Sequence, residues 1–380
     1  MRMMDSAQFD AAVAAANIPG AVGMIVDPDG VRFARAVGEA DAVGHVPMRE
    51  DTLFQIASMT KAVTSVAAMQ LVEQGRLSLD ADIGTVLPDL ANPQVMLGTG
   101  PNGKPQLRPA KGPITLRHLL THTAGLGYFF IHPEVLGYYM ATGMPAPGSL
   151  DTIRMPLMYD PGESWEYSVA TDWVGQAVEA VTRQTLGDYF AEHVTGPLGM
   201  NATAFRPEMP ADAAKVHVRA ADGSGWTINP AVLGGGDFHM GGGGLSSTAG
   251  DYARFVRMLL RGGELDGTRI LQAETIAEMT RNQVAPLRAG KMGTAMPEMA
   301  AEYDTFPDQH TGWGLGFLIN PEQGPHGRSP GSLAWAGIFN SYYWFDPARQ
   351  VGGVFMSQMA PFGDSGALAA FGALEEMAYT

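Results

Sequence analysis

The chain has 380 residues, 46% of them apolar, and its 39 acidic and 24 basic side chains give a formal net charge of −15. This charge disfavours nucleic acids and anionic membranes as partners, and no run of about 18 apolar residues predicts a membrane span. The absence of cysteine excludes disulfides, thiolate nucleophiles and cysteine-based metal sites. The apolar fraction is enough for one large domain or two closely packed ones.

The N-terminus has no long apolar stretch of the kind that a signal peptide needs. We therefore expect a cytoplasmic protein, with the periplasm as the alternative if a leader has been removed. Residues 4–17 predict a small amphipathic helix instead. Residues 20–38 predict a β-hairpin, because two apolar runs flank the Asp-Pro-Asp-Gly turn at 27–30.

The middle of the chain is rich in helix and loop, and its last part is rich in strand. A nearly uncharged helix is predicted over 58–75, with Gly75 as its stop. Residues 83–230 favour loops and helices, the latter at about 115–122, 171–182 and 185–195. The remaining predicted elements are a helix over 248–262, strands over 313–319, 331–337, 340–346 and 351–358, and a helix over 364–379.

Strands near both ends, with helices between them, predict an α+β fold of the α/β sandwich type, in which helices flank an antiparallel sheet. The first and last helices would cover one face of that sheet. We expect residues 1–82 and 235–380 to form a discontinuous α/β domain, and residues 83–234 to form an inserted, mainly helical domain. The cleft between the two is the expected place of the functional site.

Ser58 and Lys61 carry the first candidate chemistry. Residues three apart on a helix share a face, so the hydroxyl and the ammonium can meet. A serine needs a base to become a nucleophile, and a lysine whose pKa is lowered by burial can supply it. The Ser58 N–H, at a helix N-terminus, is also placed to bind an oxyanion. On spacing alone an N-cap serine and a solvated lysine are the commoner interpretation, but the uncharged helix that follows favours a buried lysine.

Five runs in this order together resemble a known family. They are FQIASMTK (54–61), LVEQGRLSLD (71–80), ITLRHLLTHTAGL (114–126), GGGLSST (242–248) and WGLGF (313–317). The combination is similar to serine β-lactamase-related proteins of the class C type. The resemblance implies a β-lactamase/transpeptidase-like fold, with Ser58 as nucleophile and Lys61 and Tyr167 as the general-base system.

The family's second motif, Tyr-x-Asn, reads Tyr167-Ser168-Val169 in this chain. In penicillin-recognising members the asparagine amide contacts the substrate. Its replacement by Val169, a candidate substrate-binding residue here, disfavours β-lactamase activity. The longer run YSVATDWVG is similar to members that act as esterases.

The third motif, normally Lys-Thr-Gly, has two candidates. His-Thr-Gly at 310–312 mimics it but comes too early, whereas Trp-Ala-Gly from Trp335 to Gly337 falls where the motif belongs and resembles family VIII carboxylesterases. Tryptophan in place of lysine removes a cation suited to a β-lactam carboxylate and adds an apolar wall suited to an uncharged ester. By the same resemblance, the N–H of Ile338 is the second oxyanion donor beside that of Ser58.

Other candidates have both functional and structural interpretations. His118 and His122 have a spacing that can bind metal, but no third ligand pattern lies nearby, so we expect no metal site. His239 precedes the glycine run and is expected to line the cleft. Tyr128 is expected to wall the acyl pocket, with core packing as an equal alternative. Glu166 is interpreted as structural.

These patterns favour a serine hydrolase that cleaves carboxylic esters through a Ser58 acyl-enzyme and uses no cofactor. An acyltransferase that passes the acyl group to an alcohol or amine is the nearest alternative, followed by a β-lactamase or D-peptidase. A catalytically silent binding protein remains the alternative from another class. The absence of a Gly-x-Ser-x-Gly motif disfavours an α/β-hydrolase. The expected partner is a small-molecule ester, and the sequence does not give the oligomeric state.

Overall fold

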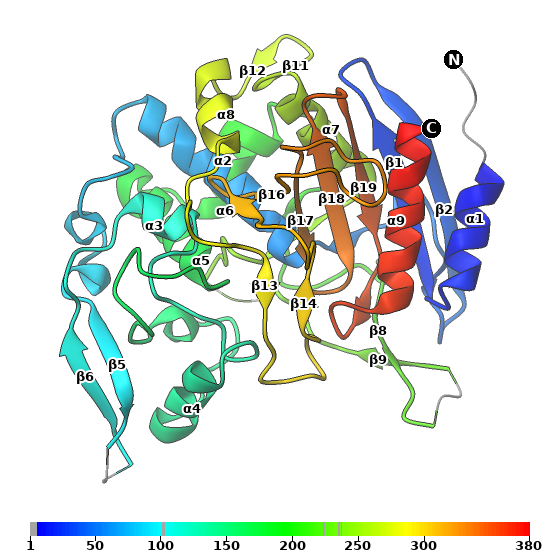
Figure 1. Ribbon diagram of the computed structural model, residues 1–380. Helices are drawn as coiled ribbons and strands as arrows, with labels where there is room; N and C mark the ends of the chain where they lie inside the picture. Colours follow the sequence, from blue (N-terminus) through cyan, green and yellow to red (C-terminus); the bar gives the residue numbers. More distant parts are fainter. Residues whose placement is uncertain (1–5, 101–102, 223–224, 235, 237) are drawn as a thin grey trace.

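The computed structural model describes residues 6–100, 103–222, 225–234, 236 and 238–380. Its centre is an antiparallel eight-stranded sheet with the order β15-β16-β17-β18-β19-β1-β2-β3 (Figure 1). The strands are β1 (Gly20–Val26), β2 (Val31–Asp41), β3 (Val46–Pro47), β15 (Gly312–Trp313), β16 (Leu318–Ile319), β17 (Leu333–Gly337), β18 (Ser341–Asp346) and β19 (Val351–Met356). The N-terminal hairpin and the C-terminal strands thus share one sheet, and the predicted α+β fold of the α/β sandwich type is confirmed.

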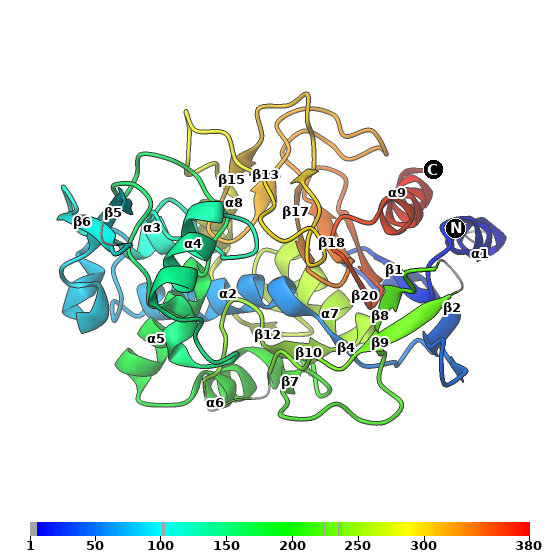
Figure 2. The ribbon, with the colours of Figure 1, turned by 90° about the horizontal axis from the view of Figure 1, so that it is seen from below.

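Helices cover both faces of this sheet. The first and last helices, α1 (Ser6–Ala15) and α9 (Ser365–Tyr379), pack together on one face, and α7 (Ala249–Leu260) packs on β1, β18 and β19 (Figures 1 and 2). Every residue of β1 is buried, as expected for a central strand covered on both sides. A Cβ on Gly23 would lie 2.6 Å from the Phe9 ring, so this glycine lets α1 approach the sheet closely.

A mainly helical region lies beside the sheet. Helix α2 (Thr60–Glu73) follows a short 3₁₀ turn at Ala57–Met59 and packs on α5 (Ala170–Thr182). All of α2 from Thr60 to Leu71 is buried, which explains its nearly uncharged sequence. The other helices are α3 (Leu116–Leu120), α4 (Pro133–Thr142), α6 (Leu186–Phe190) with a π-helical turn at Ala191–Thr195, and α8 (Ala273–Thr280). No helix in the described ranges is long and apolar enough to span a bilayer.

Shorter strands lie outside the eight-stranded sheet. They are β4 (Phe54–Gln55), β5 (Gln94–Thr99), β6 (Pro105–Pro109), β7 (Ala204–Phe205), β8 (Val216–Arg219), β9 (Trp226–Asn229), β10 (Leu245–Ser247), β11 (Glu264–Leu265), β12 (Thr268–Arg269), β13 (Lys291–Met292), β14 (Tyr303–Asp304) and β20 (Met359–Ala360). Strand β7 pairs with β10, and β8 pairs with β20. Backbone ladders therefore cross the expected domain boundary. The boundary itself stays a prediction, and residue 235 lies outside the described residues.

The observed elements differ from the sequence prediction at several places. The expected strand over 313–319 is wrong: β15 and β16 are separated by a tight turn in which Gly316 has φ +107° and the Gly314 N–H bonds to the Phe317 carbonyl. Helices α4 and α8 and the hairpins β5–β6 and β8–β9 are additional elements. The predicted first helix is observed as α1, and its residues 4 and 5 lie outside the described residues.

Phe9 offers a test of how α1 holds the sheet. Its side chain is fully buried and contacts the rings of Phe33 and Phe355 at centroid distances of 5.8 and 6.3 Å. We expect Phe9→Ala to lower the free energy of unfolding by about 3–5 kcal/mol, because it leaves a cavity beneath α1. Chemical denaturation measures the change. The exposed Gln8→Ala is the matched control on the same helix, and a loss below about 1 kcal/mol for Phe9→Ala would contradict this packing.

Candidate active site

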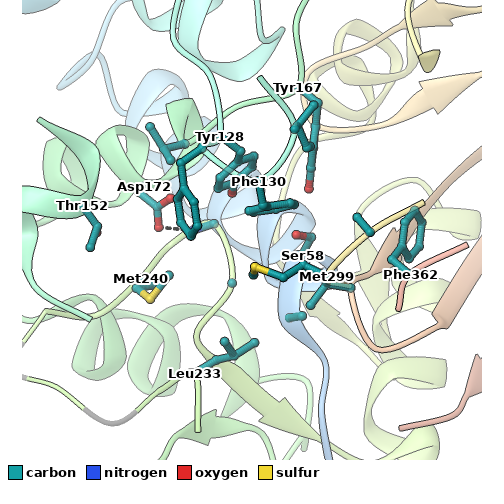
Figure 3. Close-up of a pocket in the computed structure, with 18 of the residues that line it drawn as sticks. Ser58, Tyr128, Phe130, Thr152, Tyr167, Asp172, Leu233, Met240, Met299 and Phe362 are labelled. Carbon is teal, nitrogen blue, oxygen red and sulfur yellow. Dashed lines mark hydrogen bonds between the residues drawn. The ribbon is translucent and has the colours of Figure 1, made fainter. Parts of the chain in front are cut away.

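A cavity of about 630 Å³ lies between the sheet and the helical region. Its walls are mostly apolar and aromatic, and methionines such as Met240 and Met299 contribute to them (Figure 3). Ser58 and Tyr167 are among the few polar side chains that line it. No lysine, arginine or histidine belongs to the lining in the described part of the chain. Such a cavity suits an uncharged ligand held by few polar contacts.

Ser58 lies in the 3₁₀ turn that leads into α2, and strand β17 packs on this turn. The preceding residue, Ala57, has φ +45°, a left-handed conformation that non-glycine residues adopt at a cost. A Cβ on Gly337, at the end of β17, would collide with the Ile56 carbonyl. The glycine therefore allows the strand end to lie directly against the backbone before Ser58.

Lys61 is buried one turn further along, with 1% of its surface exposed. Its Nζ donates to Ser58 Oγ at 3.2 Å, to the Tyr128 hydroxyl at 2.9 Å and to the Gly242 carbonyl at 2.6 Å. These three acceptors use all three N–H donors of an ammonium group. Burial lowers the pKa of Lys61 to about 7 because the charged form loses its hydration. Ser58 thus faces an amine that can change protonation state near neutral pH.

Tyr167 lines the same cavity as Ser58 (Figure 3). Its hydroxyl accepts a hydrogen bond from Trp335 Nε1 at 3.0 Å, and Lys61 Nζ lies 4.7 Å from the centre of its ring. Burial raises the pKa of the Tyr167 phenol, and its contacts with Ser58 and Trp335 oppose this shift. The phenol is therefore neutral at ordinary pH and able to donate a proton.

Four predicted substrate-binding residues and the predicted oxyanion donor Ile338 line the cavity. Tyr128, Val169, Trp335, Gly337 and Ile338 all belong to its walls. The second candidate for the third motif does not: His310 bonds through Nε2 to the Pro286 carbonyl and is absent from the lining.

His239 requires a correction. The structure places it outside the lining of the cavity, although it precedes the glycine run. Its Nδ1 accepts the Gly187 N–H at 3.2 Å, and its ring stacks on Phe205 with a centroid distance of 4.3 Å. The ring is therefore held against α6, so the expected role in substrate binding does not fit.

His118 and His122 are held by different partners. His118 Nδ1 accepts the Thr115 N–H, whereas His122 Nδ1 lies 3.0 Å from Ser168 Oγ in the core. Within the described ranges, no three His, Asp or Glu side chains are grouped as metal ligands. Glu166 lies 3.7 Å from the His132 ring and does not line the cavity, and burial raises its pKa to about 6.

Asp172 is the residue of the site that sequence reasoning missed. It lies in the first turn of α5, is fully buried, and lines the cavity beside Tyr128 (Figure 3). Its Oδ1 accepts the Gly242 N–H at 2.8 Å. The available signal was a single carboxylate in the otherwise uncharged run YSVATDWVG.

The sheet with helices on both faces, and a serine and lysine at the start of a buried helix, define a β-lactamase/transpeptidase-like protein. The match to the family described as "Beta-lactamase" extends over residues 6–376, and the chain belongs to this family.

Three relatives show the range of activities around this chain. It is 33% identical over 390 residues to monacolin J acid methylbutanoyltransferase of Aspergillus terreus, covering 95% of this chain and 91% of that protein. It is 30% identical over 363 residues to lovastatin esterase of Penicillium rubens, covering 91% and 90%. A mutant of simvastatin synthase from Aspergillus terreus has a similar structure, with a TM-score of 0.84, 30% identity and coverage of 98% and 93%. The chain is thus an enzyme of the β-lactamase fold family.

The contact between β17 and the turn before Ser58 predicts that Gly337→Ala is destabilising. The added Cβ must displace the strand end or the Ile56 carbonyl, and such overpacking costs about 1–3 kcal/mol. Denaturant unfolding measures the loss. Gly112→Ala is the control, because a Cβ there meets nothing within 4 Å. Equal stability of the two variants would contradict the close approach.

Proposed function

We propose that this protein is a serine acyl-transfer enzyme, which takes an acyl group from an uncharged ester onto Ser58 and passes it to an alcohol. Hydrolysis is the competing outcome when water replaces the alcohol. The observation that carries the proposal is the hydrogen bond between Lys61 Nζ and Ser58 Oγ at the edge of an apolar cavity. This pair supplies a nucleophile and its base in the absence of any cofactor.

The proposed first step forms the acyl-enzyme. Neutral Lys61 takes the proton of Ser58, whose Oγ attacks the ester carbonyl carbon. The backbone N–H groups of Ser58 and Ile338 would stabilise the negative oxygen that develops. The carbon–oxygen bond to the leaving alcohol then breaks, and Tyr167 donates the proton that this oxygen needs. Lys61 returns its proton to Tyr167, so both groups end the step as they began.

The second step decides between acyl transfer and hydrolysis. An alcohol enters, loses its proton to the same base system and attacks the acyl carbon. The bond from that carbon to Ser58 Oγ then breaks, and the base system returns the proton to Ser58. An apolar cavity disfavours water relative to an apolar alcohol. The similarity to monacolin J acid methylbutanoyltransferase and simvastatin synthase supports transfer.

A carboxylesterase is the second candidate. The Trp-Ala-Gly motif from Trp335 to Gly337 lines the cavity, as a family VIII carboxylesterase would require, and lovastatin esterase is among the relatives. A β-lactamase or D-peptidase is less well supported. Val169 offers no amide to a substrate, and no cationic side chain in the described residues lines the cavity to bind a carboxylate.

Intact-protein mass spectrometry tests the proposal. After incubation with p-nitrophenyl butyrate, we expect a butyryl adduct on the Ser58 peptide. Ser58→Ala should lose the adduct and on the order of 10³-fold or more in turnover. Ser65→Ala is the matched control, a buried serine of the same helix whose hydroxyl has no hydrogen-bond partner.

Adding 1-octanol to the same reaction separates the two candidates. Octyl butyrate formed in preference to butyrate supports acyl transfer, whereas butyrate alone supports the carboxylesterase. Turnover by Ser58→Ala equal to the wild type would overturn the mechanism. No adduct with this ester or with a fluorophosphonate would favour a catalytically silent binding protein.

The protonation of Lys61 predicts how activity depends on pH. The base must be neutral to accept the Ser58 proton, so kcat/KM should rise with pH through the pKa of about 7. Below this pH the ammonium form accumulates and activity falls about tenfold per pH unit. Initial rates on p-nitrophenyl butyrate, corrected for spontaneous hydrolysis, measure the profile. A flat profile between about pH 5.5 and 8.5 would argue against Lys61 as the base.

A further inference from the structure

Asp172 is a buried carboxylate that the proposed chemistry does not use. Its exposed fraction is 0%. Among the described residues Lys61 acts on it through charge, and no lysine, arginine or histidine side chain hydrogen-bonds to it. Burial of a carboxylate without a contacting cation is costly unless its charge is stabilised at longer range. Its location in the first turn of α5 contributes, because the N-terminal end of a helix favours negative charge.

Gly242 connects Asp172 to Lys61. Its N–H donates to Asp172 Oδ1 at 2.8 Å, and its carbonyl accepts from Lys61 Nζ at 2.6 Å. A Cβ on Gly242 would lie 2.6 Å from Asp172 Oδ2, so a larger residue would push the two apart. Asp172 therefore holds the residue whose carbonyl fixes the ammonium beside Ser58.

The second carboxylate oxygen of Asp172 holds no backbone group in place. Asp172 Oδ2 is buried and has no hydrogen-bond partner. A carboxylate retained only to bind the Gly242 N–H could be replaced by an amide at no electrostatic cost. What distinguishes aspartate from asparagine here is its ability to carry a negative charge, which would act on Lys61 through a low-dielectric interior.

The other titratable groups around Lys61 are neutral. Burial raises the pKa values of Tyr128 and Tyr167, and burial together with Lys61 lowers the pKa of His122 well below its usual range. In the part of the chain that the structure describes, Asp172 is the acidic group that acts on Lys61: burial lowers the pKa of the ammonium, and Asp172 raises it. The two effects oppose each other on one amine. Burial in turn raises the pKa of Asp172, and Lys61 and the Gly242 N–H oppose that shift.

We propose that Asp172 is a positioning residue that fixes Lys61 through Gly242 and provides the counter-charge that lets the amine both take and return a proton near neutral pH. A buried lysine without this charge would stay neutral and would return the proton poorly. The catalytic consequence rests on the function proposed above, whereas the electrostatic coupling does not depend on it.

The test compares the pH dependence of Ser58 labelling by a fluorophosphonate in wild type, Asp172→Asn and Asp172→Ala. Asparagine keeps an oxygen for the Gly242 N–H but loses the charge, so the rise in labelling rate should move to lower pH by about one unit or more. Alanine should show the same shift and also a lower maximal rate, because the Gly242 N–H loses its acceptor. Asp251→Asn is the control: Asp251 lies in the first turn of α7 and binds Ala202 N–H and Thr203, away from the cavity.

An unshifted profile in a folded Asp172→Asn protein, with the wild-type rate, would overturn the proposal. A lower rate without a shift would also overturn it, since this is what a purely structural role predicts. Thermal unfolding of each variant establishes that it is folded.

A second measurement needs neither turnover nor a variant at Asp172. ¹⁵N NMR of lysine-labelled wild-type protein, with Lys61 assigned through Lys61→Arg, follows the charge of the amine directly. We expect two inflections in the Lys61 signal, one from its own proton and a smaller one from protonation of Asp172. A single inflection would overturn the coupling. Absence of labelling at every pH would instead overturn the proposed function, while the NMR result would still decide the role of Asp172.

Discussion

The burial of one ammonium group organises the site. Lys61 is buried, so each of the three N–H donors of its ammonium group needs a hydrogen-bond acceptor inside the protein. The acceptors come from three separate stretches of chain: Ser58 in the 3₁₀ turn before α2, Tyr128 in the loop between α3 and α4, and Gly242 in the glycine run before β10. Since these stretches are far apart in sequence, the requirement to satisfy one amine holds α2, the loop before α4 and the glycine run against one another.

Close backbone approach is the second constraint, and glycine makes it possible. Gly337 brings β17 against the turn before Ser58, and Gly242 fits between Asp172 and Lys61. The backbone is strained at Ala57, the residue before the serine, which has a left-handed conformation. A few polar side chains therefore occupy fixed positions in a cavity whose walls are mostly apolar. This arrangement combines a rigid reacting centre with a binding surface that methionine side chains can adapt to different shapes.

The sequence predicts what depends on short-range periodicity. The Ser58–Lys61 pair, the hairpin at 20–38 and the buried helix that became α2 follow from spacing and composition alone. Tyr167 and Trp335 come from distant parts of the chain, and a family resemblance was needed to place them beside Ser58. Their roles remain predictions, although the structure brings them within one cavity.

The predictions that were missed or wrong depend on contacts and backbone angles that short-range sequence patterns do not show. Asp172 reaches Lys61 through the backbone of Gly242, a contact between residues far apart in sequence. His239 lies next to a glycine run that does line the cavity, but its ring turns toward α6 instead. The strand expected over 313–319 is broken by the positive φ of Gly316, since an alternation of small and large residues fits a turn and a strand equally well.

The pairing of β1 with β19 has a consequence for the order in which parts of the fold can form during synthesis. Strand β1 lies between β2 and β19, and the N–H of Gln55, just before the Ser58 turn, bonds to a side chain 303 residues later, that of Gln358. The chain is synthesised from its N-terminus. The backbone before Ser58 and strand β1 therefore cannot contact Gln358 and β19 until almost the whole chain has been made. A chain that stops short of β19 therefore lacks both the strand that pairs with β1 and the side chain that binds the backbone before Ser58.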